Sequence, residues 1–303
     1  MEVSVIITAL DEPYINKTID DIVEKSDSRL KEIIVIDDLS EQPIKHKDAK
    51  IIRNKERKGL IKGRNIATEI AKSECVISVD AHVKVSENWL DGILNPLAKR
   101  YNAVVAPMTM ALDPDKWEDI NIDSYGYTTH WKWDLDFYWG SKSRYTPAVA
   151  GHCFGFTKNW WEESGRFDDG MKTWGGENIE FPLRTWLFGG TVEVADCWVS
   201  HWFKQEFNYS MDFKTLLSNK ARVVEVWFDE YKHNFYNCVG FKNHFELGDL
   251  SERMRLKFKK QVRSFKWFLD NVNTSLKNSF PEPEVSKEDI DRLLIKSKRC
   301  VNK

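Results

Sequence analysis

The chain lacks the glycine patterns of two common classes of nucleotide-binding protein. Neither GxGxxG nor GxxxxGK[ST] occurs in its 303 residues, which disfavours a dinucleotide-binding Rossmann enzyme and a P-loop NTPase. It also lacks any window close to the ~18–20 apolar residues of a membrane span. The N-terminus, MEVSVIITALDE, has no basic segment of the kind that opens a signal peptide. These features predict a soluble, intracellular protein without a membrane partner.

Cysteine is scarce, and charge is unevenly distributed. The five Cys residues form no CxxC pair, which is typical of reduced thiols in a cytosolic protein. The formal net charge is only −2, yet the segment from Ser251 to the end holds 14 Lys and Arg against 7 Asp and Glu. A basic segment of this kind can meet an acidic partner, although a solvated basic helix is the commoner explanation. The 13 Trp residues allow a sizeable core and make disorder an unsuitable description.

The first hundred residues alternate β-rich runs with helical patterns. Strands are predicted at residues 3–10, 30–40, 49–54 and 75–83, and helices at residues 14–26 and 59–73. This order is typical of an α/β fold, with a parallel sheet and helices on its faces. Ligands of such sheets bind at the carboxyl ends of the strands.

Polar residues fall where these strands are predicted to end. The stretch VISVDAHVKV places Asp80 and His82 two residues apart, so on a strand they would share one face. They can form a polar strand end in contact with water, or they can hold a divalent cation. A cation would also neutralise the diphosphate of a nucleotide leaving group, and the presence of histidine favours Mn²⁺ over Mg²⁺.

Seven segments in the same order resemble the catalytic domain of the polypeptide N-acetylgalactosaminyltransferases. They are SVIITALDE, EIIVIDDLS, ERKGLIKGRNIA, VDAHV, WGGENIEFPLRTWLFGGTVEVADCWVSHWFK, GDLSERMRLK and FKWFLDNV. The resemblance covers about residues 3–285 and implies a GT-A fold with a C-terminal helical segment. It also implies one catalytic domain over residues 1–285, divided into a nucleotide-binding half (1–105), an acceptor half (106–245) and C-terminal helices (246–285), followed by a basic tail (286–303).

The resemblance implies a role for individual residues. The metal ligands, for Mn²⁺ or alternatively Mg²⁺, are Asp80, His82 and His201. The residues that bind the UDP-sugar are Thr8, Asp38, Arg57, Arg64, Asp80, Gly151, His152, Lys204 and Tyr209. The residues at the reacting centre are Trp174, which begins a mobile loop, Glu177 and Asn178. The aromatic residues of the acceptor groove are Trp131, Trp133, Phe137 and Phe203.

Several of these residues have structural alternatives. His201 can be a packed strand histidine, and Glu177 can cap the helix that follows it, since carboxylates favour helix N-termini. The run HWKWDLDFYW can consist of core aromatics. Trp174 can also belong to the core, although the Gly pair after it suggests a hinge.

The expected activity is retaining transfer of a sugar, GalNAc first, from a UDP-sugar to a Ser or Thr hydroxyl of a protein. In the resembling family the acceptor attacks from the face that UDP leaves, and Glu177 is the one candidate for a double displacement. A hydroxymethylated pyrimidine in DNA is the alternative acceptor, and a non-catalytic nucleotide-sugar-binding module is a weaker alternative. The identity of the sugar and the oligomeric state stay open.

Three departures from the family bear on these expectations. Lys204 stands where the family usually has arginine, and Val83 stands where it has cysteine. His152 replaces the second glycine of a turn that approaches the sugar, so it can fill the N-acetyl space, bond a sugar hydroxyl or point away. The family's membrane anchor, stem and lectin module do not occur in this sequence. We therefore expect a cytoplasmic enzyme of a bacterium or a virus rather than a Golgi enzyme.

Overall fold

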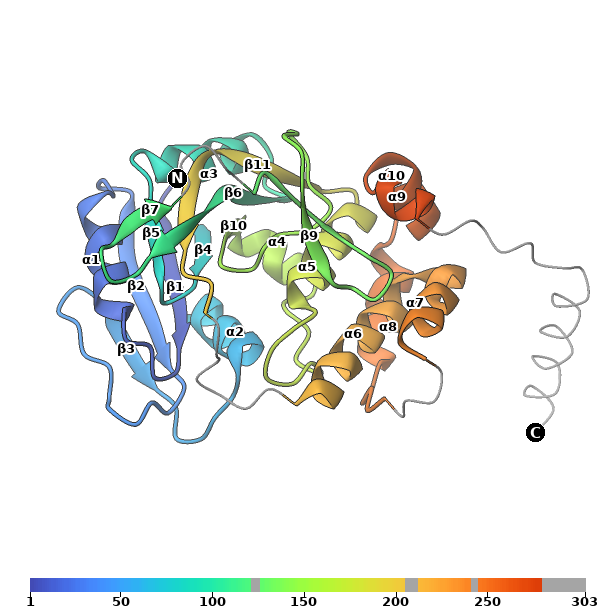
Figure 1. The fold of residues 1–303 in the computed structure, drawn as a ribbon, viewed down its shortest axis with the longest axis horizontal. Helices are drawn as coiled ribbons and strands as arrows, with labels where there is room; N and C mark the ends of the chain where they lie inside the picture. The colour runs from blue at the N-terminus through green and yellow to red at the C-terminus, as the bar shows by residue number, and fades with distance from the viewer. Residues whose placement is uncertain (121–125, 205–211, 241–244, 280–303) are drawn as a thin grey trace, which may run out of the picture.

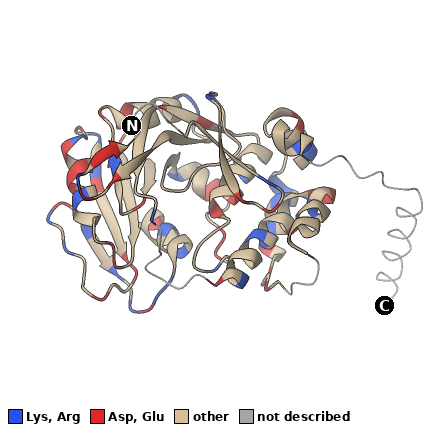
Figure 2. Cartoon of the chain, viewed as in Figure 1, with Lys and Arg blue, Asp and Glu red and all other residues tan. Residues whose placement is uncertain are grey.

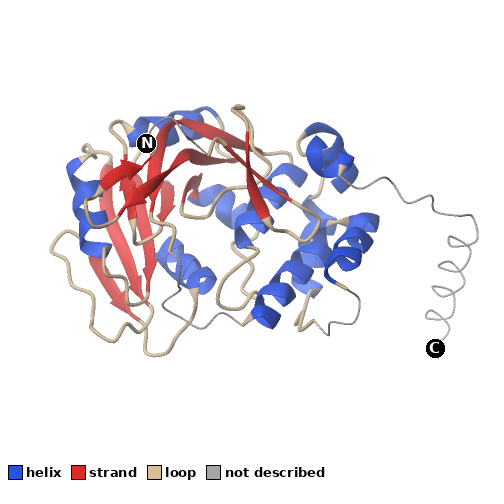
Figure 3. Cartoon of the chain, viewed as in Figure 1, coloured by secondary structure: helices blue, strands red, loops and turns tan. Residues whose placement is uncertain are grey.

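A nine-stranded mixed sheet forms the centre of the molecule (Figures 1 and 3). This computed structural model describes residues 1–120, 126–204, 212–240 and 245–279. The strand order is β3-β2-β1-β4-β10-β6-β11-β5, and β7 pairs with β6. The strands of the sheet are β1 (Val3–Ala9), β2 (Leu30–Asp37), β3 (Lys50–Arg53), β4 (Cys75–Val79), β5 (Val83–Val85), β6 (Ala103–Asp113), β7 (Glu118–Ile120), β10 (Cys153–Thr157) and β11 (Thr191–His201).

The first four strands in this order are parallel, as the alternation of strands and helices predicted. Strand β10 enters between β4 and β6 and runs antiparallel to both. The carboxyl ends of β1, β2 and β4 therefore lie at one edge of the sheet, and the start of β10 lies there too. This edge is the place where ligands of open α/β sheets bind.

Helices cover both faces of the sheet. On one face, α1 (Ile15–Glu24) and α3 (Trp89–Lys99) pack against side chains such as Val5 and Ile7 of β1. On the other face, α2 (Leu60–Ile70), α4 (Lys158–Glu163) and α5 (Glu177–Leu187) share a core with Ile6. Because strand side chains alternate between faces, one short apolar strand supplies both cores.

The turn between β4 and β5 corrects one sequence prediction. The strand expected over residues 75–83 ends at Val79, and β5 pairs with β11 at the far end of the sheet. Asp80 and His82 therefore lie in a turn rather than on one face of a strand. The residues after Asp80 cannot fold back onto β4, because β1 and β10 occupy both places beside it.

A helical flank packs beside the sheet (Figure 1). It comprises α6 (Phe213–Trp227), a 3-10 turn (Asp229–Tyr231), α7 (Lys232–Val239), α8 (Ser251–Lys260), α9 (Phe265–Asn271) and α10 (Thr274–Asn278). A two-stranded hairpin of β8 (Thr128–Trp131) and β9 (Phe137–Gly140) lies against it. Within the part of the chain that the structure describes, no helix combines the length and the apolar character needed to cross a bilayer.

Charged residues of both signs are spread over the chain in Figure 2, and some of them are buried where the flank meets the sheet. The buried carboxylate of Asp168 accepts hydrogen bonds from Arg222 Nε (2.6 Å) and Nη2 (2.9 Å) on α6. Arg253 Nε of α8 lies 3.4 Å from Asp168 Oδ1. Burial raises the pKa of Asp168, but its hydrogen bond to Arg222 and the charges of Arg253 and Arg222 outweigh burial and lower the pKa overall.

We predict that Asp168→Asn lowers the free energy of unfolding by roughly 3–5 kcal/mol, because two buried guanidinium groups lose their counter-charge. The folded pKa of Asp168 is below that of the unfolded chain, so its contribution is complete above about pH 4 and is lost as the pH falls further. Urea denaturation from pH 7 to pH 3 should therefore show a weaker acid destabilisation in the variant than in the wild type. Asp270→Asn, which alters two exposed ion pairs, with Lys266 and Lys277, is the control. Equal stability of Asp168→Asn and wild type at pH 7 would contradict the assignment.

Candidate functional site

A cavity of about 910 Å³ opens at the carboxyl edge of the sheet. Its wall is built from the segments after β1, β2 and β4, the turn before β10, the end of β11 and residues 172–178. The hairpin β8–β9 and helix α6 complete it from the side of the flank. Of the sequence-predicted site residues, these line the cavity: Thr8, Asp38, Arg57, Arg64, Asp80, His82, Phe137, Gly151, His152, Trp174, Glu177, Asn178, His201, Phe203 and Lys204.

Asp80, His82 and His201 converge at this cavity although they lie up to 121 residues apart in the sequence. Their ligand atoms all lie within 4.8 Å of one another. The two Nε2 atoms of His82 and His201 are 3.1 Å apart, and His201 Nε2 is 3.5 Å from Asp80 Oδ2. Strand β11 ends at His201 beside the start of β5, and this pairing brings the two imidazoles together.

The protonation of this cluster suits a metal ion. Burial raises the pKa of Glu12, but its hydrogen bond to His82 and the nearby charges of His82 and Lys204 lower it overall, so Glu12 is a carboxylate. Its Oε2 lies 3.0 Å from His82 Nδ1, which donates to it, while His82 Nε2 faces His201. Burial also lowers the pKa of His201, which favours the neutral ring. Two imidazoles and one carboxylate are a donor set that fits a divalent transition-metal ion such as Mn²⁺.

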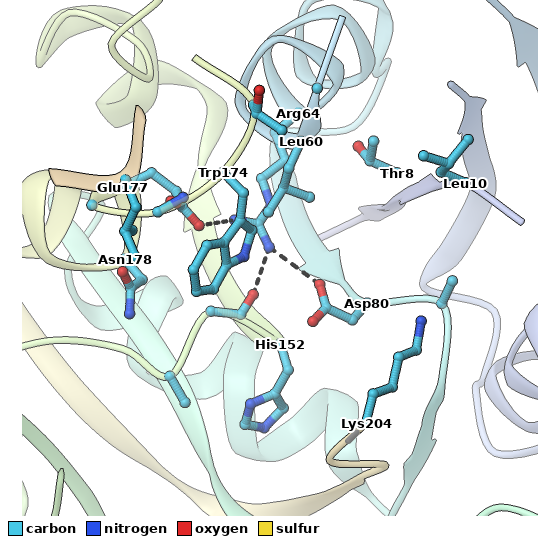
Figure 4. A pocket seen from close by; sticks show the side chains of 18 of the residues that line it. Thr8, Leu10, Leu60, Arg64, Asp80, His152, Trp174, Glu177, Asn178 and Lys204 are labelled. Carbon is cyan, nitrogen blue, oxygen red and sulfur yellow. Dashed lines mark hydrogen bonds and ion pairs between the residues drawn. The ribbon is translucent and has the colours of Figure 1, made fainter. Parts of the chain in front are cut away.

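Arg64 joins this cluster to the opposite wall of the cavity. Its guanidinium is 2% exposed and donates to Glu177 Oε1 (3.1 Å), Asp80 Oδ1 (3.3 Å) and the carbonyl oxygen of Gly151 (2.6 Å). Figure 4 shows the side chain lying between Glu177 and Asp80. The sequence placed Arg64 among the residues that bind the nucleotide. In the structure its donors serve the protein instead, so its visible role is to position other groups.

Glu177 and Asn178 begin α5 at the end of the WGG segment. Glu177 Oε2 accepts a hydrogen bond from the amide of Gly175 (3.0 Å), while Oε1 meets Arg64. Asn178 Nδ2 donates to the carbonyl of Val149 (3.3 Å). Asn219 of α6 donates to the carbonyl oxygens of Lys172 and Trp174, which ties the segment to the flank. Glu177 therefore both stabilises the start of α5 and lines the cavity.

Asp38 holds a loop in the wall expected to face the nucleotide. The two carboxylate oxygens of Asp38 accept hydrogen bonds from the backbone amides of Lys58 (2.7 Å) and Gly59 (2.9 Å). These bonds fix the backbone of the loop that carries Arg57. Thr8 Oγ1 is buried and has no hydrogen-bond partner among the described residues. Lys204 Nζ lies 2.6 Å from both oxygens of Glu12. Tyr209 falls outside the described residues.

The aromatic residues predicted for the acceptor groove separate into two groups. Trp131 and Trp133 are buried in the core, so the prediction that they line the groove is wrong. Trp131 stacks on Phe268 of α9 with ring centroids 5.3 Å apart, and Trp133 packs against aromatic rings of the flank. Phe137 (45% exposed) and Phe203 (47% exposed) do line the cavity.

Among the cavity residues that sequence reasoning did not name, Trp139 and Glu12 bear most on the site. Trp139 is 36% exposed and meets the edge of Phe137 at a centroid distance of 5.8 Å. The same aromatic run signalled it, since Phe137 and Trp139 alternate along β9. Glu12 lies directly after SVIITALD, but no local pattern links it to His82, which is 70 residues away.

Comparisons with known proteins point to one group of enzymes. Residues 4–165 match the family model described as glycosyl transferase family 2. The chain is 34% identical to human polypeptide N-acetylgalactosaminyltransferase 3 over 80% of this chain and 44% of the relative. It is 31% identical to human polypeptide N-acetylgalactosaminyltransferase 14 over 90% of this chain and 52% of the relative. The chain thus spans about half the length of the curated relatives it matches.

A solved structure extends this similarity to the fold. GalNAc-T7, crystallised with UDP, GalNAc and Mn²⁺, superposes with a TM-score of 0.84 at 27% sequence identity. The match covers 92% of this chain and 58% of that chain. The predicted α/β GT-A architecture and the relationship to polypeptide N-acetylgalactosaminyltransferases are confirmed. The expected cytoplasmic location in a bacterium or virus-infected cell is contradicted, because these curated relatives come from animals.

The geometry around Glu12 predicts a loss of metal affinity in Glu12→Gln. The amide keeps the shape but removes the charge that polarises His82, and outer partners of metal-binding histidines typically change affinity about 10–100-fold. Titration of the purified protein with Mn²⁺, followed by electron paramagnetic resonance, measures the dissociation constant. Glu24→Gln, on the exposed side of α1, is the matched control and should bind as the wild type does. An unchanged dissociation constant in Glu12→Gln would remove Glu12 from the metal centre.

Proposed function

Since the chain belongs to glycosyl transferase family 2, we propose that it transfers a sugar from a UDP-sugar to a Ser or Thr hydroxyl of a polypeptide. The observation that carries this proposal is the cluster of Asp80, His82 and His201 in the wall of a large cavity at the carboxyl edge of the sheet. The names of the curated relatives support a polypeptide acceptor. The UDP, GalNAc and Mn²⁺ bound to GalNAc-T7 support UDP-GalNAc as donor and Mn²⁺ as cofactor. Mg²⁺ is the alternative cofactor, because carboxylate ligands also suit it.

Different residues of the cavity are proposed to have different roles in such a transfer. Asp80, His82 and His201 would hold the metal ion, which when bound would supply positive charge to the diphosphate leaving group. Arg57 and the backbone held by Asp38 lie at the wall proposed for the nucleotide. Trp174 lies next to this wall, because the carbonyl oxygen of Thr173 accepts a hydrogen bond from the amide of Leu60 (2.9 Å). Asn178 lies beside the turn at Gly151. The sugar is proposed to lie between the nucleotide wall and this turn.

The transfer is proposed to retain the configuration of the sugar. The bond between the anomeric carbon and the phosphate oxygen breaks, and the acceptor oxygen forms the new bond on the same face. The proton of the acceptor hydroxyl passes to an oxygen of the departing phosphate, so no protein base is required. Stabilisation of the charge on the leaving group is then the main contribution of the protein.

The aromatic side of the cavity suits an extended peptide. Phe137 and Trp139 of β9 and Phe203 after β11 expose their rings along it. Aromatic rings supply large apolar contact areas with few rotatable bonds, which suits the binding of peptide side chains and backbone. The alternative acceptor, a hydroxymethylated pyrimidine in DNA, has no support among the named relatives. It is therefore an outcome to be tested and not a second proposal.

We predict that release of UDP from UDP-GalNAc requires a divalent cation. Activity should be highest with Mn²⁺, lower with Mg²⁺ and abolished by EDTA, and His201→Ala should reduce it at least about a hundredfold, as expected for the loss of a main electrostatic stabiliser. His233→Ala, which changes a histidine of α7 outside the cavity and outside the metal-type groups, is the control. Full activity in EDTA would rule out the metal-dependent mechanism.

The acceptor is identified by offering labelled UDP-GalNAc together with either a Ser/Thr peptide library or hydroxymethylpyrimidine DNA. We expect label in the peptide and none in the DNA. Phe137→Ala and Trp139→Ala should each raise the KM for the best peptide about tenfold, which corresponds to about 1.4 kcal/mol. Tyr145→Ala removes an equally exposed aromatic ring outside the cavity and should leave KM unchanged. Label found in DNA alone would overturn the proposed acceptor.

A further inference from the structure

The ring orientations of His82 and His201 in the metal-type cluster, which consists of Asp80, His82 and His201, are fixed by different contacts. Nδ1 of His82 donates to Glu12, as expected for a metal-binding histidine, whose second ring nitrogen usually bonds an oxygen that fixes the ring. Nδ1 of His201 is buried and has no hydrogen-bond partner among the residues that the structure describes. Apart from the contacts of its Nε2 with His82 and Asp80, the orientation of the His201 ring depends on packing.

Besides His82, its partner in the cluster, two aromatic rings pack against His201. The ring centroid of His152 lies 4.8 Å away at an interplanar angle of 37°, and that of Phe203 lies 4.6 Å away at 73°. Phe203 is half exposed on the cavity wall, so solvent covers much of its ring. His152 is only 4% exposed and is enclosed by protein. Of these two neighbours, His152 is the one whose own position is fixed by burial.

His152 is also anchored by hydrogen bonds at both its side chain and its backbone. Its Nε2 shares a hydrogen bond with Thr109 Oγ1 of β6, at 3.1 Å. The backbone of Thr109 is held in turn by reciprocal hydrogen bonds with Gly126 of 2.9 and 2.8 Å. The carbonyl oxygen of His152 accepts a hydrogen bond from the amide of Asp80 (2.8 Å). One residue therefore contacts two of the three candidate metal ligands.

We propose that His152 is a positioning residue that holds the imidazole of His201 in the orientation required for metal binding, by packing against it while anchored to Thr109. The proposal rests on the proposed function, because it concerns the same metal site. It also replaces the idea that His152 selects the sugar. Figure 4 shows its imidazole directed away from Arg64 and Asp80, and its Nε2 is occupied by Thr109.

The first test replaces His152 with glycine, the residue that the family resemblance leads us to expect at this position. His152→Gly removes the ring that packs on His201 and the link to Thr109, but it preserves the backbone contact to Asp80. We expect the dissociation constant for Mn²⁺, measured by electron paramagnetic resonance without donor, to rise about tenfold. The visible absorption spectrum of the Co²⁺-substituted protein should also change, because the ligand geometry changes.

The second test separates positioning from general stability through Thr109. Thr109→Val removes the hydroxyl at nearly constant volume and should weaken Mn²⁺ binding severalfold, whereas Thr109→Ser should restore it. Thr128→Val is a matched control, because Thr128 Oγ1 lies 3.1 Å from Nε2 of His130 in the hairpin, outside the cavity. It should leave Mn²⁺ affinity and the Co²⁺ spectrum as in the wild type. Thermal unfolding in EDTA shows whether each variant is folded.

The outcomes distinguish this inference from the proposed function. Wild-type affinity and spectrum in folded His152→Gly and Thr109→Val would overturn it. A changed preference between UDP-GalNAc and UDP-glucose in His152→Gly, at unchanged Mn²⁺ affinity, would also overturn it in favour of sugar selection. If the wild type binds Mn²⁺ but transfers no sugar, the proposed function fails while the role of His152 stands. If the wild type binds no Mn²⁺, both fail.

Discussion

The buried guanidinium of Arg64 is the constraint on which the rest of the site depends. A charge that is removed from water must be compensated by charges or hydrogen bonds inside the protein. Arg64 finds its partners in three separate segments, namely Asp80 after β4, the carbonyl of Gly151 before β10, and Glu177 at the start of α5. Any rearrangement that withdraws one of them leaves the guanidinium short of a partner. The distance between the metal-type cluster and the WGG segment is therefore set by one side chain.

Positively and negatively charged side chains alternate across the cavity from Arg64 to Lys204. Asp80 shares its oxygens between Arg64 and His201, while Glu12 connects His82 to Lys204. Apart from the two histidines, this chain of groups contains two cations, Arg64 and Lys204, against the three carboxylates Glu12, Asp80 and Glu177. The carboxylates therefore exceed the cations by one negative charge, beside two imidazole nitrogens. A bound divalent cation would compensate this charge, which gives a physical reason for the close packing of acidic and basic groups here.

The sequence could predict the features that depend on local pattern, and it failed where distant segments meet. Periodicity located β1, β2 and α2, and the two-residue spacing drew attention to Asp80 and His82. It could not show that β10 displaces the chain from the sheet after Val79, which turns an expected strand into a bend. Trp131 and Trp133 were misplaced because the rings that bury them belong to the helical flank, 95 to 137 residues later in the chain. Glu12 was missed for the same reason, since only the folded chain brings it to His82.

The surroundings of Glu177 bear on how the proposed transfer keeps the configuration of the sugar. A double displacement would require this carboxylate to attack the anomeric carbon, yet both of its oxygens are engaged, by Arg64 and by the amide of Gly175. Withdrawing one partner from a buried ion pair costs roughly 3–5 kcal/mol. At about 1.4 kcal/mol per tenfold, that cost would slow the chemical step by two to four orders of magnitude. Attack by the acceptor hydroxyl on the face that UDP leaves requires no such break, and it keeps Glu177 in place to orient Arg64. The hydrogen bonds of Glu177 to Arg64 and to the amide of Gly175 thus both hold the site together and argue against Glu177 as a nucleophile.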